Sequence, residues 1–362
     1  MNEPQLLKPG ENIKIVITDG EVLKILKTIY GIVPQSIVEL NGYDDRNYKI
    51  TVKCPNTAQV DEYVLKFLNS LDSKDTSLME GQSGMLLFLN SSGVTCPKPI
   101  KNVNGTYFSI ENFVSGQHCV RLLEYIPGSI LKDVHPSPSL FYQIGKFVAE
   151  LDRLLKNFYH PVYDTHQSLW MFESIPSVKK FLFAIKDDAK REIINTIFEE
   201  FENRVLSISH NLERGMIHGD VNEHNIIVQH NNDKCELKGV IDFGDCQNSC
   251  YLYELAITIT YMLIVSRDLN VAGYVLAGYN TVRKITDDEY SLLKICIMSR
   301  LGQSYTMGTY SYLRDPKNAY VLSSLKDGWE MLMKLNEESE KETLNKWTLT
   351  LNNYNHFISG SI

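Results

Sequence analysis

The sequence predicts an α+β protein with a small N-terminal lobe of antiparallel strands and a larger, mainly helical C-terminal lobe. Two observations predict this division. Between residues 37 and 67, apolar and polar side chains alternate, as they do in half-buried strands. Beyond the break at Pro127-Gly128, apolar side chains instead recur every three to four residues, the period of an amphipathic helix. We therefore expect two domains, residues 1–126 and 127–362.

The individual elements follow from the same patterns in chain order. Strands are expected at residues 37–40, 48–52 and 63–67, with a turn at Asn41-Gly42 after the first. A helix over residues 76–89 and strands at 107–113 and 119–125 complete the first lobe. In the second lobe, helices are expected around 144–151 and at 178–185, 192–206 and 251–266. Two short strands, 226–228 and 239–241, precede the last of these helices.

Composition and charge exclude several classes of protein. The chain has 362 residues and a formal net charge of −8, which argues against nucleic acid as a main partner. Its longest apolar run covers only residues 255–265, whereas a membrane helix needs about 20 residues. The N-terminus lacks the basic and apolar regions of a signal peptide, and the seven cysteines are scattered without a CxxC pair. We expect a cytoplasmic protein whose cysteines are thiols.

The residues that carry chemistry lie beside the two short strands. Asp220 and Asn225 share the loop before residues 226–228, and Asp242 follows the second strand in Asp-Phe-Gly-Asp. The hard oxygens of Asn225 and Asp242 suit Mg²⁺ that carries phosphate. Asp220 is then left to orient and deprotonate a nucleophile. An Asp-xxxx-Asn loop followed by Asp-Phe-Gly is the arrangement found in kinases.

The first lobe supplies candidates for nucleotide binding. Lys66, in the third strand, is expected to reach the α- and β-phosphates, steadied by a carboxylate from the next helix. Glu80 is the expected partner, although Asp75 is also near in sequence. The backbone of Glu124 and Ile126 is expected to face the base.

The segment that would cover the phosphates is unusual. The chain contains no Walker A sequence, and the turn at residues 41–47 has a single glycine. The Asn47 side chain and backbone amides would therefore have to contact the phosphates. The alternative is that this segment is an ordinary hydrogen-bonded hairpin turn.

At these motifs the sequence resembles the aminoglycoside phosphotransferase and choline kinase branch of the protein-kinase-like fold, and within it the hydroxylysine kinases. His218-Gly219-Asp220 replaces the His-Arg-Asp of protein kinases, and no Ala-Pro-Glu follows. The resemblance extends over roughly residues 36–335 and includes the stretches 43–48, 62–66, 121–128, 218–227, 239–245, 275–279 and 299–304. It implies a two-lobed kinase that phosphorylates the 5-hydroxyl of 5-hydroxylysine in the cytoplasm, with GTP as donor and Mg²⁺. The hinge residues do not distinguish guanine from adenine, so ATP remains possible.

Hydroxylysine carries two ammonium groups and one carboxylate, so its site needs acids and at least one cation. Asp245 is a candidate for an ammonium group, or else stabilises its own turn. Arg300 is a candidate for the carboxylate, or else forms an ordinary ion pair. Tyr251, at the start of the helix after the metal loop, is a third candidate.

Two alternatives remain open from the sequence. One is a kinase of the same branch that acts on choline, ethanolamine, homoserine or an aminoglycoside. The other is a kinase fold without activity that serves as a binding module. The presence of Lys66, Asp220, Asn225 and Asp242 together argues against the second. The sequence leaves the oligomeric state open.

Overall fold

The computed structural model describes residues 7–8, 10–53, 60–231, 234–314 and 319–360. The contacts between residues divide the chain into two compact units. One comprises residues 1–127 with 160–166, and the other comprises residues 128–159 with 167–362. The chain thus returns briefly to the first unit at residues 160–166. There Val162 and Tyr163 lie against Gly81 of helix α2 (Thr76–Ser91), where a larger side chain would collide with them. No pattern in the sequence indicated this return.

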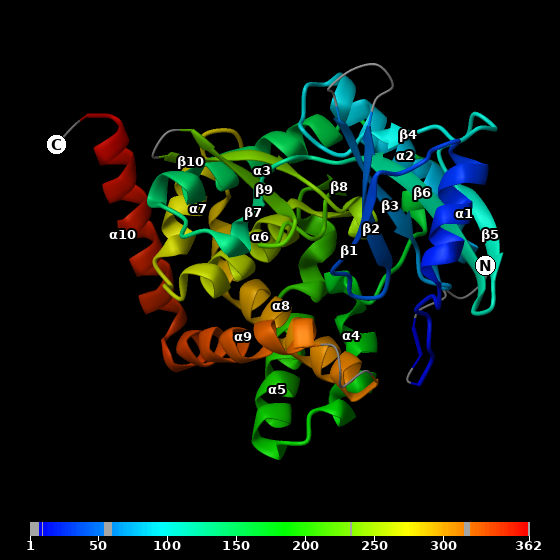
Figure 1. Ribbon diagram of the computed structural model, residues 1–362. Helices are drawn as coiled ribbons and strands as arrows, with labels where there is room; N and C mark the ends of the chain where they lie inside the picture. Colours follow the sequence, from blue (N-terminus) through cyan, green and yellow to red (C-terminus); the bar gives the residue numbers. More distant parts are fainter. Residues whose placement is uncertain (1–6, 9, 54–59, 232–233, 315–318, 361–362) are drawn as a thin grey trace. The chain divides into compact units, whose positions relative to one another are not determined.

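The first unit is built on an antiparallel sheet, drawn in blue to cyan in Figure 1. Its strand order is β1-β2-β3-β6-β4, with β5 also paired to β6. The strand bounds are β1 Ser36–Leu40, β2 Arg46–Lys53, β3 Val60–Phe67, β4 Pro99–Ile100, β5 Ser109–Phe113 and β6 Gly116–Glu124. The strands that alternation predicted are therefore confirmed, as is the helix at residues 76–89. Helix α1 (Asp19–Ile29) was not predicted; its buried Val22 and Leu26 belong to the core beneath the sheet.

The register of this sheet places charged side chains next to one another. Lys66 on β3 is paired with Asn47 on β2 and with Arg121 on β6. Lys66 and Arg121 are both buried. Two cations on adjacent strands need acceptors nearby, and those acceptors form part of the candidate site described below.

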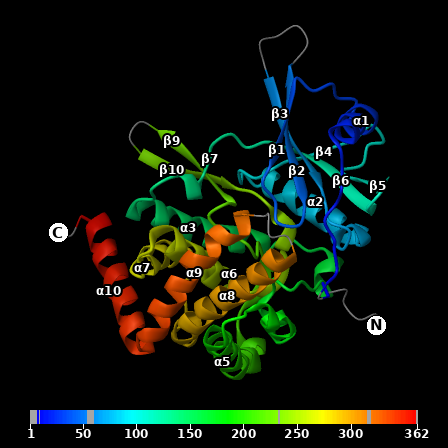
Figure 2. The same ribbon diagram turned by 60° about the horizontal axis from the view of Figure 1, so that its bottom comes forward.

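The second unit is mainly helical. Its longer helices are α3 Pro138–Leu155, α5 Asp188–Arg204, α6 Tyr251–Ser266, α7 Val271–Tyr279, α8 Asp287–Arg314, α9 Ala319–Glu337 and α10 Glu340–Ile358. Helix α6 is buried along almost its whole length, as its apolar sequence predicts. Helix α7 packs against α3 and α10, and α9 packs against α8 (Figure 2). The helix expected at residues 178–185 is instead the short α4 (Ile175–Val178) followed by a 3₁₀ segment, Lys179–Ala184.

Small sheets lie among these helices and carry the motifs. Strand β9 (Ile226–Asn231) pairs with β10 (Lys234–Val240) and with β7 (Ser129–Ile130). Strand β8 (Arg214–Ile217) pairs with β11 (Gln247–Cys250). The loop with Asp220 therefore runs from β8 to β9, and Asp242 lies just after β10. Within the described ranges, none of the helices combines the length and apolar character needed to cross a bilayer.

The packing of α3 against α7 depends on two glycines. A Cβ on Gly145 would overlap the Val275 carbonyl oxygen, and one on Gly278 would overlap that of Tyr142. We expect Gly145→Ala or Gly278→Ala to destabilise the protein by about 1–3 kcal/mol, the cost of overpacking. Gly328→Ala on α9 is the control, because no atom lies nearer than 3.8 Å to its added Cβ. Urea unfolding measures all three; equal stabilities would contradict this account of the α3–α7 contact.

Candidate active site

The loop from His218 to Asn225 is held from several sides. Gly219 has φ +79°, and a Cβ there would overlap the carbonyl oxygen of Asp245, so only glycine fits. The backbone N–H of Gly219 donates to Oε2 of Glu254 on α6, at 2.9 Å. Burial is the main cause that raises the pKa of Glu254, to about 7. Glu254 thus braces the loop from within the helical unit.

His218 ties the loop to the segment that carries Asp242. Its Nδ1 accepts from the backbone N–H of Asp220 at 3.2 Å, so Nε2 carries the proton and donates to the Ile241 carbonyl oxygen at 3.1 Å. Its ring packs edge-on against Phe243, with 4.6 Å between ring centroids. Burial lowers the pKa of His218 to about 4, which keeps the ring neutral. With these contacts, His218 orders the loop.

The Asp220 carboxylate has three side-chain donors. Oδ1 accepts from Nη2 of Arg300 at 3.1 Å, and Oδ2 accepts from the side-chain amides of Asn222 and Asn225, each at 2.8 Å. Burial, the largest cause, raises the pKa of Asp220, and the guanidinium of Arg300 opposes it. A carboxylate that is oriented and has a raised pKa is suited to accept a proton from a hydroxyl group.

Asn225 and Asp242 are the two residues predicted to bind magnesium. The Asn225 amide nitrogen also donates to the Asp220 carbonyl at 2.9 Å, which leaves its Oδ1 as the oxygen able to bind a metal. Asp242 is exposed and has the left-handed backbone φ of 60°, a strained conformation for a residue other than glycine. Within the part of the chain that is described, no three His, Cys, Asp or Glu side chains cluster as metal ligands. Two protein oxygens completed by phosphates and water suit Mg²⁺.

The structure corrects the expected partner of Lys66. Its Nζ lies 3.2 Å from Oδ2 of Asp45, in the turn between β1 and β2. Glu80 is exposed on α2, whereas Gln82 faces inward and accepts from Arg121 at 2.7 Å. Two residues along a helix correspond to about 200° of rotation, so Glu80 and Gln82 occupy opposite faces.

Two acids, Asp45 and Asp72, act on this buried lysine. The backbone N–H of Asn69 donates to Oδ1 of Asp45, and its side chain donates to Asp72 at 2.7 Å. Burial and the charge of Asp45 raise the pKa of Asp72 to about 6. Sequence reasoning missed Asp45, although it stands two positions before Asn47 in the predicted turn.

The other nucleotide candidates have structural contacts of their own. Asn47 Nδ2 lies 3.5 Å from the Asn41 carbonyl oxygen, a contact across the hairpin turn. The backbone N–H of Glu124 donates to the Lys98 carbonyl at 2.8 Å. A contact from the hinge to a base would therefore use other main-chain groups, such as those of Ile126, whose side chain is buried. Their nucleotide roles stay predictions.

Arg300 adopts the ion-pair alternative. Its side chain, 1% exposed, joins Asp220 and also donates through Nη1 to the Trp170 carbonyl at 2.9 Å and to Gln303 at 3.1 Å. The guanidinium lies over the rings of Trp170 and Tyr261. A guanidinium bound in this way is not a free fork for an acceptor carboxylate, contrary to the carboxylate-binding prediction. Its Nε has no hydrogen-bond partner in the described structure.

The remaining acceptor candidates differ in their placement. Asp245 contributes to the electrostatic environment of Arg300, and its carbonyl accepts from Gln247 at 3.2 Å. Tyr251 is buried with its hydroxyl next to Gly215, which favours a packing role over contact with an acceptor.

Glu223 is a loop residue that the sequence reasoning passed over. Its side chain is 4% exposed, and burial raises its pKa to about 7. The signal was present in the sequence: an acid stands inside the same motif, three positions after Asp220.

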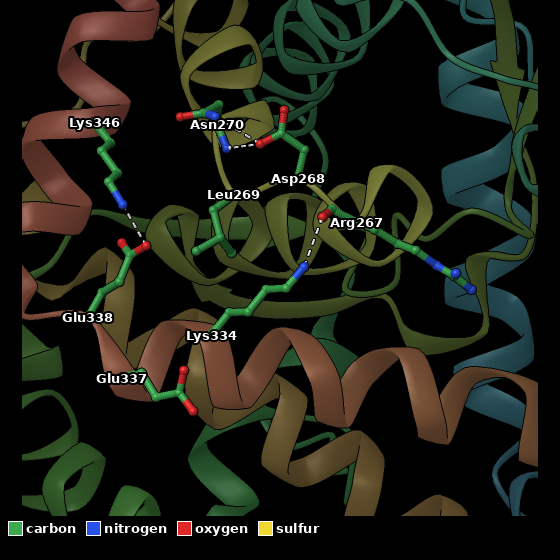
Figure 3. Close-up of a pocket in the computed structure, with 8 residues that line it drawn as sticks. All are labelled: Arg267, Asp268, Leu269, Asn270, Lys334, Glu337, Glu338 and Lys346. Carbon is green, nitrogen blue, oxygen red and sulfur yellow. Dashed lines mark hydrogen bonds and ion pairs between the residues drawn. The ribbon is translucent and has the colours of Figure 1, made fainter.

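A separate cavity of about 450 Å³ opens on the helical unit (Figure 3). Its lining residues are Arg267, Asp268, Leu269, Asn270, Lys334, Glu337, Glu338 and Lys346. Charges of both signs line it, and several are paired: Lys346 binds Glu338 at 2.6 Å, and Lys334 donates to the Arg267 carbonyl. None of the predicted site residues belongs to this lining.

Comparison with known proteins adds a relationship over the whole chain. The model of the phosphotransferase enzyme family matches residues 36–292. A hydroxylysine kinase of Xenopus laevis is 33% identical over 98% of this chain and 99% of its own. A hydroxylysine kinase of Mus musculus is 29% identical over 96% of each chain. Among solved structures, the complex of amicoumacin kinase with AMP-PNP, Ca²⁺ and Ami has a TM-score of 0.67 at 16% identity, covering 91% of this chain and 94% of its own.

The Lys66–Asp45 pair can be tested against the Glu80 alternative. We expect Asp45→Asn to raise the nucleotide KM about 10- to 100-fold, because a buried lysine loses a charged partner. Glu80→Gln, which removes an exposed carboxylate of the neighbouring helix, should leave the KM unchanged. Steady-state kinetics at saturating acceptor measures both variants. A larger effect from Glu80→Gln would restore the original assignment.

The role of Arg300 can be tested in the same way. We expect Arg300→Met to lower kcat at least about 10-fold while the acceptor KM changes little, because Asp220 loses its ion-pair partner. We also expect it to destabilise the protein by about 3–5 kcal/mol, the cost of breaking a buried pair. Arg300→Lys keeps the charge, so its losses of kcat and of stability should be smaller. A rise in acceptor KM at constant kcat would instead indicate that Arg300 binds the acceptor carboxylate.

Proposed function

The chain belongs to the phosphotransferase enzyme family, and from this premise we propose that it transfers the γ-phosphoryl group of GTP to the 5-hydroxyl of 5-hydroxy-L-lysine. The enzyme is a small-molecule kinase and a homologue of the hydroxylysine kinases. The observation that carries the substrate proposal is 33% identity to one of these kinases over almost the full length of both chains. The alignment covers 98% of this chain and 99% of its relative, so both units of this chain fall within it.

The geometry around Asp220 supports the reaction. The acceptor hydroxyl would lie against the Asp220 carboxylate, which takes its proton as the hydroxyl oxygen bonds to the γ-phosphorus and the bond to the β-phosphate oxygen breaks. Asn222 and Asn225 orient the carboxylate through Oδ2, and Arg300 stabilises its charge through Oδ1. Neutral His218 fixes the loop without competing for that proton.

Each unit has its own candidates for binding the nucleotide phosphates. In the first, Lys66 would bind the α- and β-phosphates; in the second, Asn225 Oδ1 with Asp242 would hold Mg²⁺. When bound, the metal neutralises charge on the phosphates and orients them. The six cysteines in the described ranges are free thiols, in keeping with a cytoplasmic location.

A substrate screen tests the proposed function. Purified protein is assayed with GTP and with ATP against 5-hydroxylysine, homoserine, ethanolamine, choline and an aminoglycoside, with and without Mg²⁺. We expect the highest kcat/KM for 5-hydroxylysine with GTP, and no turnover without Mg²⁺. Asp220→Asn should bind nucleotide normally but lose roughly 10²–10⁴-fold in kcat, the usual contribution of a positioned base.

The possible failures of this screen are distinct. Faster phosphorylation of another acceptor would reject the substrate and keep the kinase. A higher kcat/KM with ATP would reject only the donor. Nucleotide binding without turnover on any acceptor would favour the binding module.

A further inference from the structure

The Glu223 carboxylate is buried without an adequate partner. Its Oε1 lies 3.5 Å from Nε2 of His224, and its Oε2 has no hydrogen-bond partner in the described structure. Its backbone is well anchored, because its carbonyl oxygen accepts from the N–H of Lys132 at 3.0 Å. A buried carboxylate oxygen without a donor is costly, so such groups usually complete their bonding with a ligand or with water.

The charges around Glu223 define what such a ligand would be. The groups that act electrostatically on it include Lys132 of the neighbouring turn, Asp220 of the same loop and Asp327 of α9. The hydroxyl of Tyr261 on α6 lies in the field of Asp220, Glu223 and Arg300. Acids therefore outnumber bases on the Glu223 side of the loop. Such an environment favours a cationic ligand over an anionic one.

A second unsatisfied group lies in the same neighbourhood. Arg300, which binds Asp220 through Nη2, has a buried Nε without a hydrogen-bond partner in the part of the chain described. Glu223 therefore has an acceptor oxygen without a donor. Arg300, the ion-pair partner of Asp220, has a donor nitrogen without an acceptor. Because Arg300 is already bound by Asp220, Trp170 and Gln303, Glu223 is the group of the two that a ligand would complement, and its negative charge requires an ammonium group.

We propose that Glu223 binds the ammonium group adjacent to the hydroxyl that is phosphorylated, and so selects 1-amino-2-alcohols. This assignment rests on the proposed function for the identity of the acceptor. Glu223 follows Asp220 by three residues in a loop whose conformation is fixed by Glu254 and His218. In 5-hydroxylysine the ε-ammonium and the 5-hydroxyl are on adjacent carbons. One short loop can therefore present one carboxylate to the hydroxyl and another to the ammonium.

The test compares two acceptors that differ only in this ammonium group, hydroxylysine and its deaminated analogue 5-hydroxynorleucine. For Glu223→Gln we expect the KM for hydroxylysine to rise about 10- to 100-fold, as for loss of one charged hydrogen-bond partner. The KM values for the deaminated analogue and for GTP should stay within about twofold of wild type, because neither contact involves the lost charge. Glu337→Gln, on the exposed surface of α9, is the matched control and should change none of these values.

Further measurements separate this proposal from its alternatives. Gln removes a buried charge without changing the side chain's shape, so the Tm of the free variant should not fall. Glu223→Asp, which keeps the charge, should recover part of the preference for hydroxylysine. An equal KM increase for both acceptors, or no increase, would overturn the role of Glu223.

Failure of the proposed function gives a different result, since wild-type protein would then phosphorylate neither acceptor. In that case the preferred amino alcohol from the screen and its deaminated analogue replace the pair. The same comparison of Glu223→Gln with wild type then decides the ammonium assignment.

Discussion

The position of Asp220 depends on a carboxylate buried beneath the loop that carries it. Glu254 projects from the first turn of α6 and accepts the N–H of Gly219, whose φ of +79° no other residue would adopt without strain. Any shift of the loop would leave Glu254 unpaired in the interior, where such a group costs several kcal/mol. Because α6 is itself buried along its length, the loop takes its rigidity from the core of the helical unit.

The three buried acids of this loop differ in their partners, and these partners give them different roles. Burial raises the pKa values of Asp220, Glu223 and Glu254 alike, because desolvation disfavours each charge. Arg300 offsets this for Asp220 by direct contact, which favours the ionised form that can accept a proton from a hydroxyl group. Backbone donors lower the pKa of Glu254 in part. Glu254 and Glu223 each have one carboxylate oxygen without a hydrogen-bond partner in the described structure. The other oxygen of Glu254 accepts from Gly219, whereas that of Glu223 only lies 3.5 Å from His224, which is why Glu223 is the acid assigned to a ligand.

Local patterns in the sequence were sufficient for the elements that position the site. Alternation identified β1, β2 and β3, and apolar content identified α6. The spacing of Asp220, Asn225 and Asp242 was informative because two short paired strands fix how the chain returns. Helix α1 was also within reach, since Thr18 and Glu21 form a capping box that the sequence displays.

Other features depend on tertiary contacts that the sequence does not reveal. The 3₁₀ segment after α4 has the apolar content of a helix, and its buried Phe181 and Leu182 satisfied the helical pattern. The partner of Lys66 depended on the rotation of α2, which brings Gln82 rather than Glu80 inward. In protein kinases the phosphate-binding lysine pairs with a glutamate of a mobile helix, whose position controls activity. Here Lys66 on β3 pairs with Asp45 in the turn between β1 and β2, so the ion pair forms when these strands pair and does not require α2 to move into place.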